Sequence, residues 1–174
     1  MLRSVNSCHR IAFLVVAMAG SQLPPVVAQD VPHRPWTVTA DFTGLRTGGV
    51  GGWAYGPELG IRRDFGPRWG VELLASLPVF DTDRFTGRGA AALDLGPTLT
   101  FATDKGELGL SAGATAFLVG DYGEFTDGGI GGFVAGHATA WLSGNVGAVA
   151  GAKVRVSGGG AAYPSLSAGL AVRF

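Results

Sequence analysis

The sequence has few charged residues: Asp, Glu, Lys and Arg make up only 15% of its 174 residues, and 13 acidic residues balance 13 basic ones. Soluble domains carry about 25% charged residues, so this fraction is too low for an ordinary water-exposed surface. The 47% hydrophobic content and the balanced charge exclude a disordered tail, a coiled coil and a nucleic-acid-binding protein.

Cysteine and long apolar runs are scarce as well. The one cysteine, Cys8, cannot form a disulfide within the chain. A helix that spans a bilayer needs about 20 consecutive apolar residues, and no such run follows the first thirty residues. An apolar chain without such runs indicates a membrane protein that crosses the bilayer without helices.

The N-terminal segment has the pattern of a secretory signal peptide. Two arginines precede an apolar stretch at 11–20, and small residues lead up to a cleavage site after Ala28. The alternative is an N-terminal membrane anchor, but the apolar stretch is about half the length that a spanning helix needs. We therefore predict a signal peptide at 1–28, followed by a short periplasmic segment at 29–35.

From residue 36 onward the hydrophobic pattern has a period of two, which is typical of β-strands. Residues 92–101 show it most clearly, because every second side chain is large and apolar while the others are small or polar. The 30 glycines also disfavour helices. The eight predicted strands comprise residues 36–44, 55–65, 69–80, 92–101, 107–119, 133–143, 146–156 and 165–174.

The two faces of these strands differ in a way that favours an inside-out arrangement. One face carries the large aliphatic residues, whereas the other combines small residues with charges of both signs. Apolar-out and polar-in alternation is the pattern of transmembrane barrels. We predict an all-β fold at 36–174, an eight-stranded antiparallel up-and-down transmembrane β-barrel. The alternative is a soluble, lipocalin-like secreted binder.

Connection lengths and aromatic residues support the barrel. Short turns around residues 66–68, 103–106 and 144–145 alternate with longer loops at 45–52, 81–89, 120–132 and 157–164, as in barrels with a periplasmic turn side and an external loop side. The strand ends on the turn side carry Trp36, Phe65, Trp69, Phe101, Trp141 and Phe174, and those toward the other rim carry Phe42, Trp53, Tyr55, Phe80 and Phe133. Such aromatic girdles are expected at membrane interfaces.

The last residues resemble the C-terminal assembly signal of bacterial outer-membrane proteins, with Ser167, Gly169, Val172 and Phe174 at its polar, glycine, hydrophobic and aromatic positions. The whole region 36–174 resembles the OmpA/OmpX-type superfamily of eight-stranded barrels. This resemblance implies insertion into the outer membrane by the barrel assembly machinery, with lipids and lipopolysaccharide as neighbours. We expect a monomer without a cofactor.

Charged residues on the inward face are the first candidate site. In a lumen of low dielectric constant these charges must pair with one another or shift their pKa. We predict a salt-bridge network that fills the barrel, and a narrow gated ion path is the alternative. The predicted network comprises Asp41, Glu58, Arg62, Glu72, Asp94, Lys153 and Arg155.

His137 and Thr139 are the second candidate, because they resemble the His-x-Ser pair on a strand of the lipid A 3-O-deacylases, with threonine in place of serine. An adjacent base can activate a threonine hydroxyl. However, the strand pattern points both side chains toward the lumen, away from a lipid substrate. We therefore favour a structural histidine and predict no catalytic residue.

The long loops supply the last candidates. Asp81, Asp83, Asp121, Glu124 and Asp127 are carboxylates of the kind that bind divalent cations, but their spacing does not match an EF-hand calcium loop, so we predict solvated loop acids and no metal site. The glycine-rich stretches at 48–52 and 128–132 lack a phosphate-loop motif and are predicted to be flexible loop tips. The sequence thus favours a structural or surface-interaction protein over a lipid A-modifying enzyme or a narrow channel.

Overall fold

The computed structural model describes residues 35–46, 53–77, 80–81, 91–103, 105–118 and 129–174. The predicted signal peptide lies outside these residues. The described residues contain no helix that is long and apolar enough to cross a membrane. The described residues form nine strands: β1 (Trp36–Arg46), β2 (Trp53–Asp64), β3 (Trp69–Ser76), β4 (Phe80–Asp81), β5 (Ala91–Thr103), β6 (Gly106–Leu118), β7 (Gly129–Trp141), β8 (Val146–Ser157) and β9 (Ala162–Arg173).

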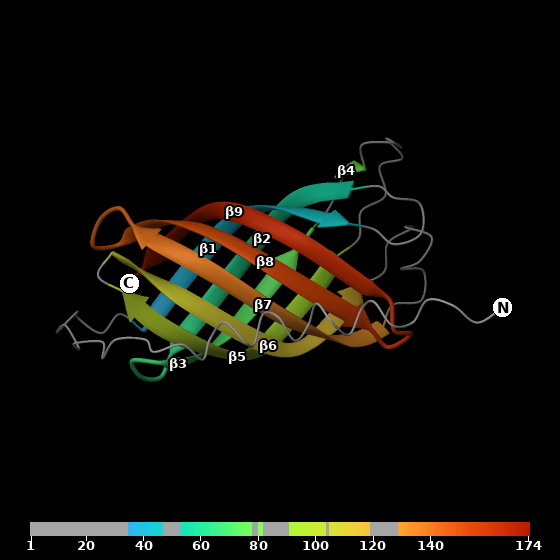
Figure 1. Cartoon of the computed structure of the whole chain (residues 1–174), viewed down its shortest axis with the longest axis horizontal. Coiled ribbons are helices and arrows are strands. Elements are labelled where there is room, and N and C mark those ends of the chain that lie inside the picture. The colour runs from blue at the N-terminus through green and yellow to red at the C-terminus, as the bar shows by residue number, and fades with distance from the viewer. Residues whose placement is uncertain (1–34, 47–52, 78–79, 82–90, 104, 119–128) are drawn as a thin grey trace, which may run out of the picture. The chain divides into compact units, whose positions relative to one another are not determined.

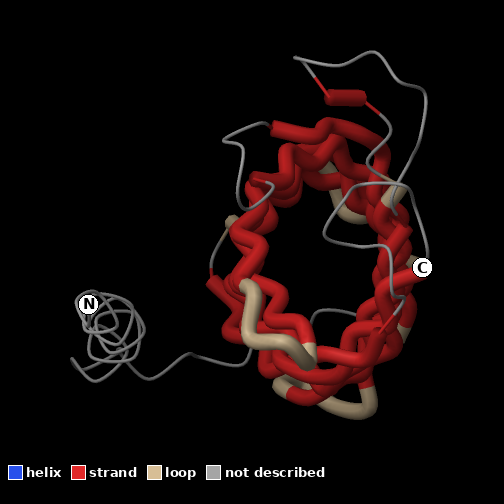
Figure 2. Tube along the Cα trace, turned by 90° about the vertical axis from the view of Figure 1, so that its right-hand side faces the viewer, coloured by secondary structure: helices blue, strands red, loops and turns tan. Residues whose placement is uncertain are grey.

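The eight long strands form a closed antiparallel barrel, as the sequence predicts (Figure 1). Each pairs with its neighbours along the chain, and β9 pairs with β1 to close the ring that Figure 2 shows along the barrel. The short strand β4 pairs with β2 and belongs to the third predicted strand. Glu58 lies opposite Ser76, whereas Tyr55 lies opposite Phe80, so the pairing shifts by one residue between β3 and β4.

Side chains alternate between the two faces of the barrel wall in the predicted sense. Leu59, on the outward face of β2, is 57% exposed, whereas Asp94, on the inward face of β5, is 0% exposed. The outward face carries most of the exposed aliphatic residues, among them Val38, Ile61, Val71, Leu73, Leu93, Leu95, Leu108, Leu110, Val134, Val154, Leu166, Leu170 and Val172. A continuous apolar surface of this kind is unfavourable in water, and it matches the lipid-facing band of a membrane barrel.

The two ends of the barrel differ. We call the end with the connections at 65–68, 104–105 and 142–145 the turn end, and the opposite end, which includes the four-residue connection 158–161, the loop end. The predicted aromatic residues Trp36, Phe65, Trp69, Phe101, Trp141 and Phe174 all lie at the turn end. There the guanidinium of Arg63 lies 5.1 Å from the ring centroid of Trp36 and 5.4 Å from that of Phe65.

Two predicted loops are wrong in part. Residues 129–132 belong to β7 and are not a loop tip, and the predicted loop 157–164 shrinks to 158–161 because β8 and β9 are longer than expected. The glycines in β7 allow close pairing, since a Cβ added to Gly131 would overlap the carbonyl oxygen of Val156 on β8. The glycine-rich stretch 48–52 lies outside the described residues.

Candidate functional site: the barrel lumen

Apolar side chains fill the lumen near the loop end. Leu45, Ala92, Phe117 and Tyr163 are buried and pack together there. The rings of Phe117 and Tyr163 lie 5.7 Å apart and are tilted by 60°. Phe133, which the sequence places toward this rim, points inward and is also buried. These aromatic rings therefore fill the interior and do not contribute to an outer girdle.

Below this apolar layer, four charged residues from three strands form what we call the Asp94 cluster: Glu58 on β2, Asp94 on β5, and Lys153 and Arg155 on β8. Lys153 Nζ donates to Glu58 Oε2 at 2.8 Å and to Asp94 Oδ2 at 2.9 Å. Arg155 donates through Nη2 to Asp94 Oδ2 at 2.7 Å and through Nε to Oδ1 at 3.0 Å. Two cations thus share two carboxylates.

Hydroxyl groups complete this cluster. The Ser76 hydroxyl donates to Glu58 and accepts a hydrogen bond from Arg155, while Thr115 Oγ1 donates to Asp94 Oδ1 at 2.8 Å. Every charged member is at least 93% buried. Buried charges are tolerated only when they are paired and hydrogen-bonded, and this arrangement meets that requirement.

A second set of polar residues, which we call the Arg62 cluster, lies nearer the turn end. Arg62 Nη2 donates to Glu107 Oε1 at 2.6 Å, and Arg62 Nε forms an ion pair with Asp64 Oδ1 at 3.0 Å. Its guanidinium also contacts Thr37 Oγ1 at 3.4 Å and His137 Nε2 at 3.3 Å. One arginine therefore joins β1, β2, β6 and β7 across the lumen.

The contacts of His137 with Arg62 and Gly109 indicate a structural role for its imidazole. A guanidinium has only donors, so Nε2 of His137 accepts the hydrogen bond from Arg62 and the ring is neutral. The imidazole packs over Gly109 so closely that a Cβ there would overlap the ring. Thr139 points into the same lumen and is buried. The pair is therefore separated by the barrel wall from lipid at the outer face.

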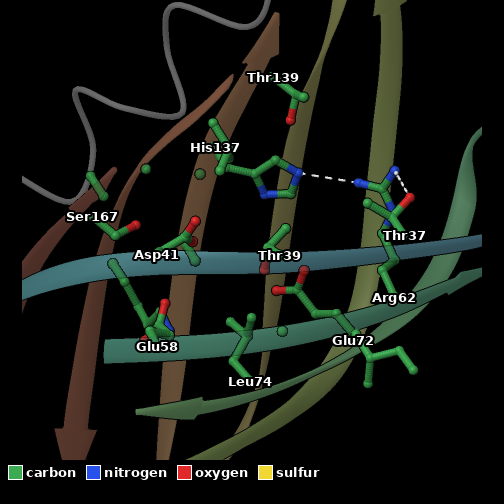
Figure 3. A pocket seen from close by; sticks show the side chains of 18 residues that line it. Thr37, Thr39, Asp41, Glu58, Arg62, Glu72, Leu74, His137, Thr139 and Ser167 are labelled. Carbon is green, nitrogen blue, oxygen red and sulfur yellow. Dashed lines mark hydrogen bonds and ion pairs between the residues drawn. The ribbon is translucent and has the colours of Figure 1, made fainter. Parts of the chain in front are cut away.

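A cavity of about 50 Å³ lies between the two clusters (Figure 3). Its polar lining includes Asp41, Glu72, Thr39 and His137, and Figure 3 shows the Glu72 carboxylate pointing into it beside Thr39. Glu72 is 95% buried, and its Oε1 has no hydrogen-bond partner in the described part of the chain. Oδ1 of Asp41 is likewise buried, and no described residue offers it a hydrogen bond.

The structure thus sorts the seven charged residues of the predicted network into three places. Glu58, Asp94, Lys153 and Arg155 come together in one cluster, Arg62 belongs to the other, and Asp41 and Glu72 line the cavity between them. Sequence reasoning left Asp64, Glu107 and His137 out of the network. The alternation along β2 and β6 could have identified the two carboxylates, because Asp64 and Glu107 fall on the inward-facing positions of these strands.

Most of the acidic residues predicted for the long loops cannot be placed. Asp83, Asp121, Glu124 and Asp127 lie outside the described residues, and Asp81 lies in β4. Among the described residues, no group of three or more His, Cys, Asp or Glu is arranged to hold a metal ion.

The four positions of the predicted assembly signal lie in or directly after β9. Ser167 and Gly169 point inward, whereas Val172 and Phe174 point outward. Phe174 also exchanges backbone hydrogen bonds with Trp36 where the barrel closes.

No protein-family model matches the sequence, and no curated protein matches it. Solved structures of bacterial eight-stranded barrels do match. Neisserial surface protein A is 17% identical with a TM-score of 0.59, and the match covers 80% of this chain and 97% of that one. Ail, the attachment invasion locus protein of Yersinia pestis, is 14% identical with a TM-score of 0.51, over 80% and 97% of the two chains.

The N-terminal β-barrel domain of Pseudomonas aeruginosa OprF is also similar, with 14% identity and a TM-score of 0.51 over 79% of this chain and 97% of that one. At such identities the likeness establishes the fold. Since nearly the whole of each of these three barrels is matched, the shared fold is the complete barrel and not a fragment of it.

Proposed function

We propose that this chain, which has the fold of the eight-stranded outer-membrane β-barrels, is an integral protein of the bacterial outer membrane with a structural or surface-interaction role. Its lumen is filled by side chains and does not conduct. The protein is a monomer that requires no cofactor. Its neighbours are outer-membrane lipids and lipopolysaccharide.

The observation that carries this proposal is the opposite chemistry of the two faces of one closed wall. Leucines such as Leu59 and Leu95 are more than half exposed on the outside, while Asp94 and Arg155 are buried on the inside. A soluble barrel places its large apolar residues in the core and its charges in water. The reverse arrangement is stable only when lipid covers the outer face.

The contents of the lumen favour a structural role over conduction. An eight-stranded barrel has an interior just wide enough for side chains to fill. Here the apolar layer around Phe117 and the Asp94 cluster occupy successive levels of the interior. An ion would have to separate the ion pairs of Arg155 and Lys153 to pass between them, which is strongly unfavourable in a buried site.

The geometry also argues against lipid A chemistry at His137 and Thr139. A deacylase needs its nucleophile and base at the surface that meets the acyl chain. Both side chains point into the lumen, and Nε2 of His137 is engaged by Arg62. We therefore assign His137 a structural role as an acceptor for Arg62.

Targeting and assembly complete the proposal. Residues 1–28 act as a signal peptide, residues 29–35 form a short periplasmic segment, and the turn end faces the periplasm. The last strand, with Ser167, Gly169, Val172 and Phe174, is recognised by the barrel assembly machinery. Its backbone pairing with β1 supports this assignment, because β9 is the strand that closes the barrel.

Fractionation followed by planar-bilayer recording tests the proposal. We expect the protein in the outer-membrane fraction, with a faster gel mobility before boiling than after it, because a closed barrel resists detergent unfolding until it is heated. The folded protein inserted in a bilayer should give no steady unitary conductance. Recovery as a soluble protein would contradict the proposed location, and a steady conductance would contradict the filled lumen.

A further inference from the structure

We propose that the cavity between the Asp94 cluster and the Arg62 cluster binds a partly hydrated monovalent metal cation, such as Na⁺, with the Glu72 carboxylate as its principal ligand. Glu72 is the central residue of this site. Its side chain is 95% buried and points into the cavity, and its Oε1 has no hydrogen-bond partner among the residues that the structure describes. A buried carboxylate oxygen without a partner is costly, so such a group calls for a positively charged or hydrogen-bonding ligand.

The basic residues of the two clusters already form ion pairs with acidic residues other than Glu72 and Asp41. Lys153 and Arg155 form their ion pairs with Glu58 and Asp94. The ion pairs of Arg62 are with Asp64 and Glu107.

Two further carboxylates, Glu72 and Asp41, face the cavity without an ion pair to any of these bases in the described part of the chain. The negative charge around the cavity therefore exceeds the positive charge, and a mobile cation would restore the balance.

The size and lining of the cavity favour a monovalent ion that keeps some of its water. A volume of about 50 Å³ has room for several water-sized groups, since one water needs roughly 10–15 Å³. The hydroxyls of Thr39 and Ser167 add oxygen ligands to the two carboxylates.

Multivalent ions fit this lining less well. Calcium takes six to eight oxygen ligands, and no group of three or more metal-ligating side chains is present among the described residues. Soft metals are disfavoured as well, because the potential ligands in the lining are carboxylate and hydroxyl oxygens, and Nε2 of His137 already accepts from Arg62.

Unfolding kinetics in detergent test this site. A cation that binds only the folded barrel, and that must leave before the barrel unfolds, lowers the unfolding rate by a factor of one plus the ratio of its concentration to its dissociation constant. The rate therefore falls on the order of tenfold when the concentration is ten times the dissociation constant. We expect sodium chloride to slow the loss of the fast-migrating folded band at constant high temperature. N-methylglucamine chloride at the same ionic strength should not, because that cation is too large for the cavity.

The matched variants are Glu72→Gln and Asp64→Asn, each of which replaces one carboxylate by an amide. Glu72→Gln should abolish the difference between the two salts. Asp64→Asn should retain it, because Asp64 pairs with Arg62 and does not line the cavity. Equal slowing by both salts in the unmodified protein would overturn the proposal, as would a full sodium effect in Glu72→Gln.

A second measurement on the unmodified protein covers the case in which Glu72→Gln does not fold. Crystals soaked in thallium(I) acetate should show an anomalous scattering peak in the cavity within ligand distance of the Glu72 carboxylate. Absence of such a peak at full soaking concentration would overturn the proposal.

Discussion

Asp94→Asn is expected to destabilise the folded barrel by about 3–5 kcal/mol, the usual cost of removing one partner from a buried ion pair. Asp94 is fully buried and accepts hydrogen bonds from Lys153, Arg155 and Thr115. The amide keeps the shape of the side chain but removes its charge, which leaves two cations with Glu58 alone. The free energy of unfolding from urea titrations in detergent or lipid vesicles measures the effect.

Thr115→Val is the matched control for this variant. It removes a single hydroxyl bond to the same carboxylate and leaves all four charges in place, so it should cost about 2 kcal/mol. If Asp94→Asn lost no more stability than Thr115→Val, the ion pairs of Asp94 would not be a main source of stability in the lumen. Neither variant should change the location of the protein, because both act inside the barrel.

Leu59→Arg should destabilise the barrel in a bilayer by about 2–4 kcal/mol, the cost of an arginine on the lipid face at the membrane midplane. Leu59 lies in the middle of β2, opposite Ala40 on β1 and Ala75 on β3, and it is 57% exposed. Its exposure means that the arginine removes no packing from a core. The cost therefore comes from lipid and not from the protein interior. The free energy of unfolding in lipid vesicles measures it.

Leu118→Arg provides the depth control, because Leu118 is also outward and exposed but ends β6 at the loop end. Near the interface the same substitution should cost only about 0–1 kcal/mol. A soluble barrel would accept both arginines equally well, since water surrounds both positions. Equal and small costs at Leu59 and Leu118 would therefore contradict a lipid-facing outer wall.

The wall of the barrel was predictable because its signal is local. In β5, Leu93, Asp94 and Leu95 fall on alternate faces whatever the neighbouring strands do, so period two alone sets their direction. The same alternation places Val134 outside and Trp141 on the inward side of β7, so Trp141 lies at the turn end without belonging to an outer girdle.

Strand ends were less predictable. Glycines favour loops by composition, yet Gly131 belongs to β7, where its lack of a side chain leaves room for the carbonyl oxygen of Val156 on β8.

The partners inside the lumen could not be predicted, because they depend on how strands on opposite sides of the barrel are staggered. Lys153 and Arg155 are predicted to face inward, but nothing in the sequence says that both reach Asp94, which lies three strands away around the sheet. The sequence also gives no sign that Glu72 forms no ion pair with any described residue. It lies opposite Arg62 in the β2–β3 pairing, yet the guanidinium turns toward Glu107 instead.

The central claim, a lipid-spanning barrel with its apolar face outward, is tested most directly by spin labels at single cysteines along β6 in lipid vesicles. The only cysteine of the sequence lies in the predicted signal peptide, so each label reports one position. Oxygen dissolved in the lipid should increase the spin-relaxation rate of labels at Leu110, Ala112 and Ala114, which point outward. Labels at Ser111 and Thr115, which are buried inside, should show no such increase. Strong relaxation of the outward labels by a water-soluble nickel complex, or loss of the alternation, would contradict the account.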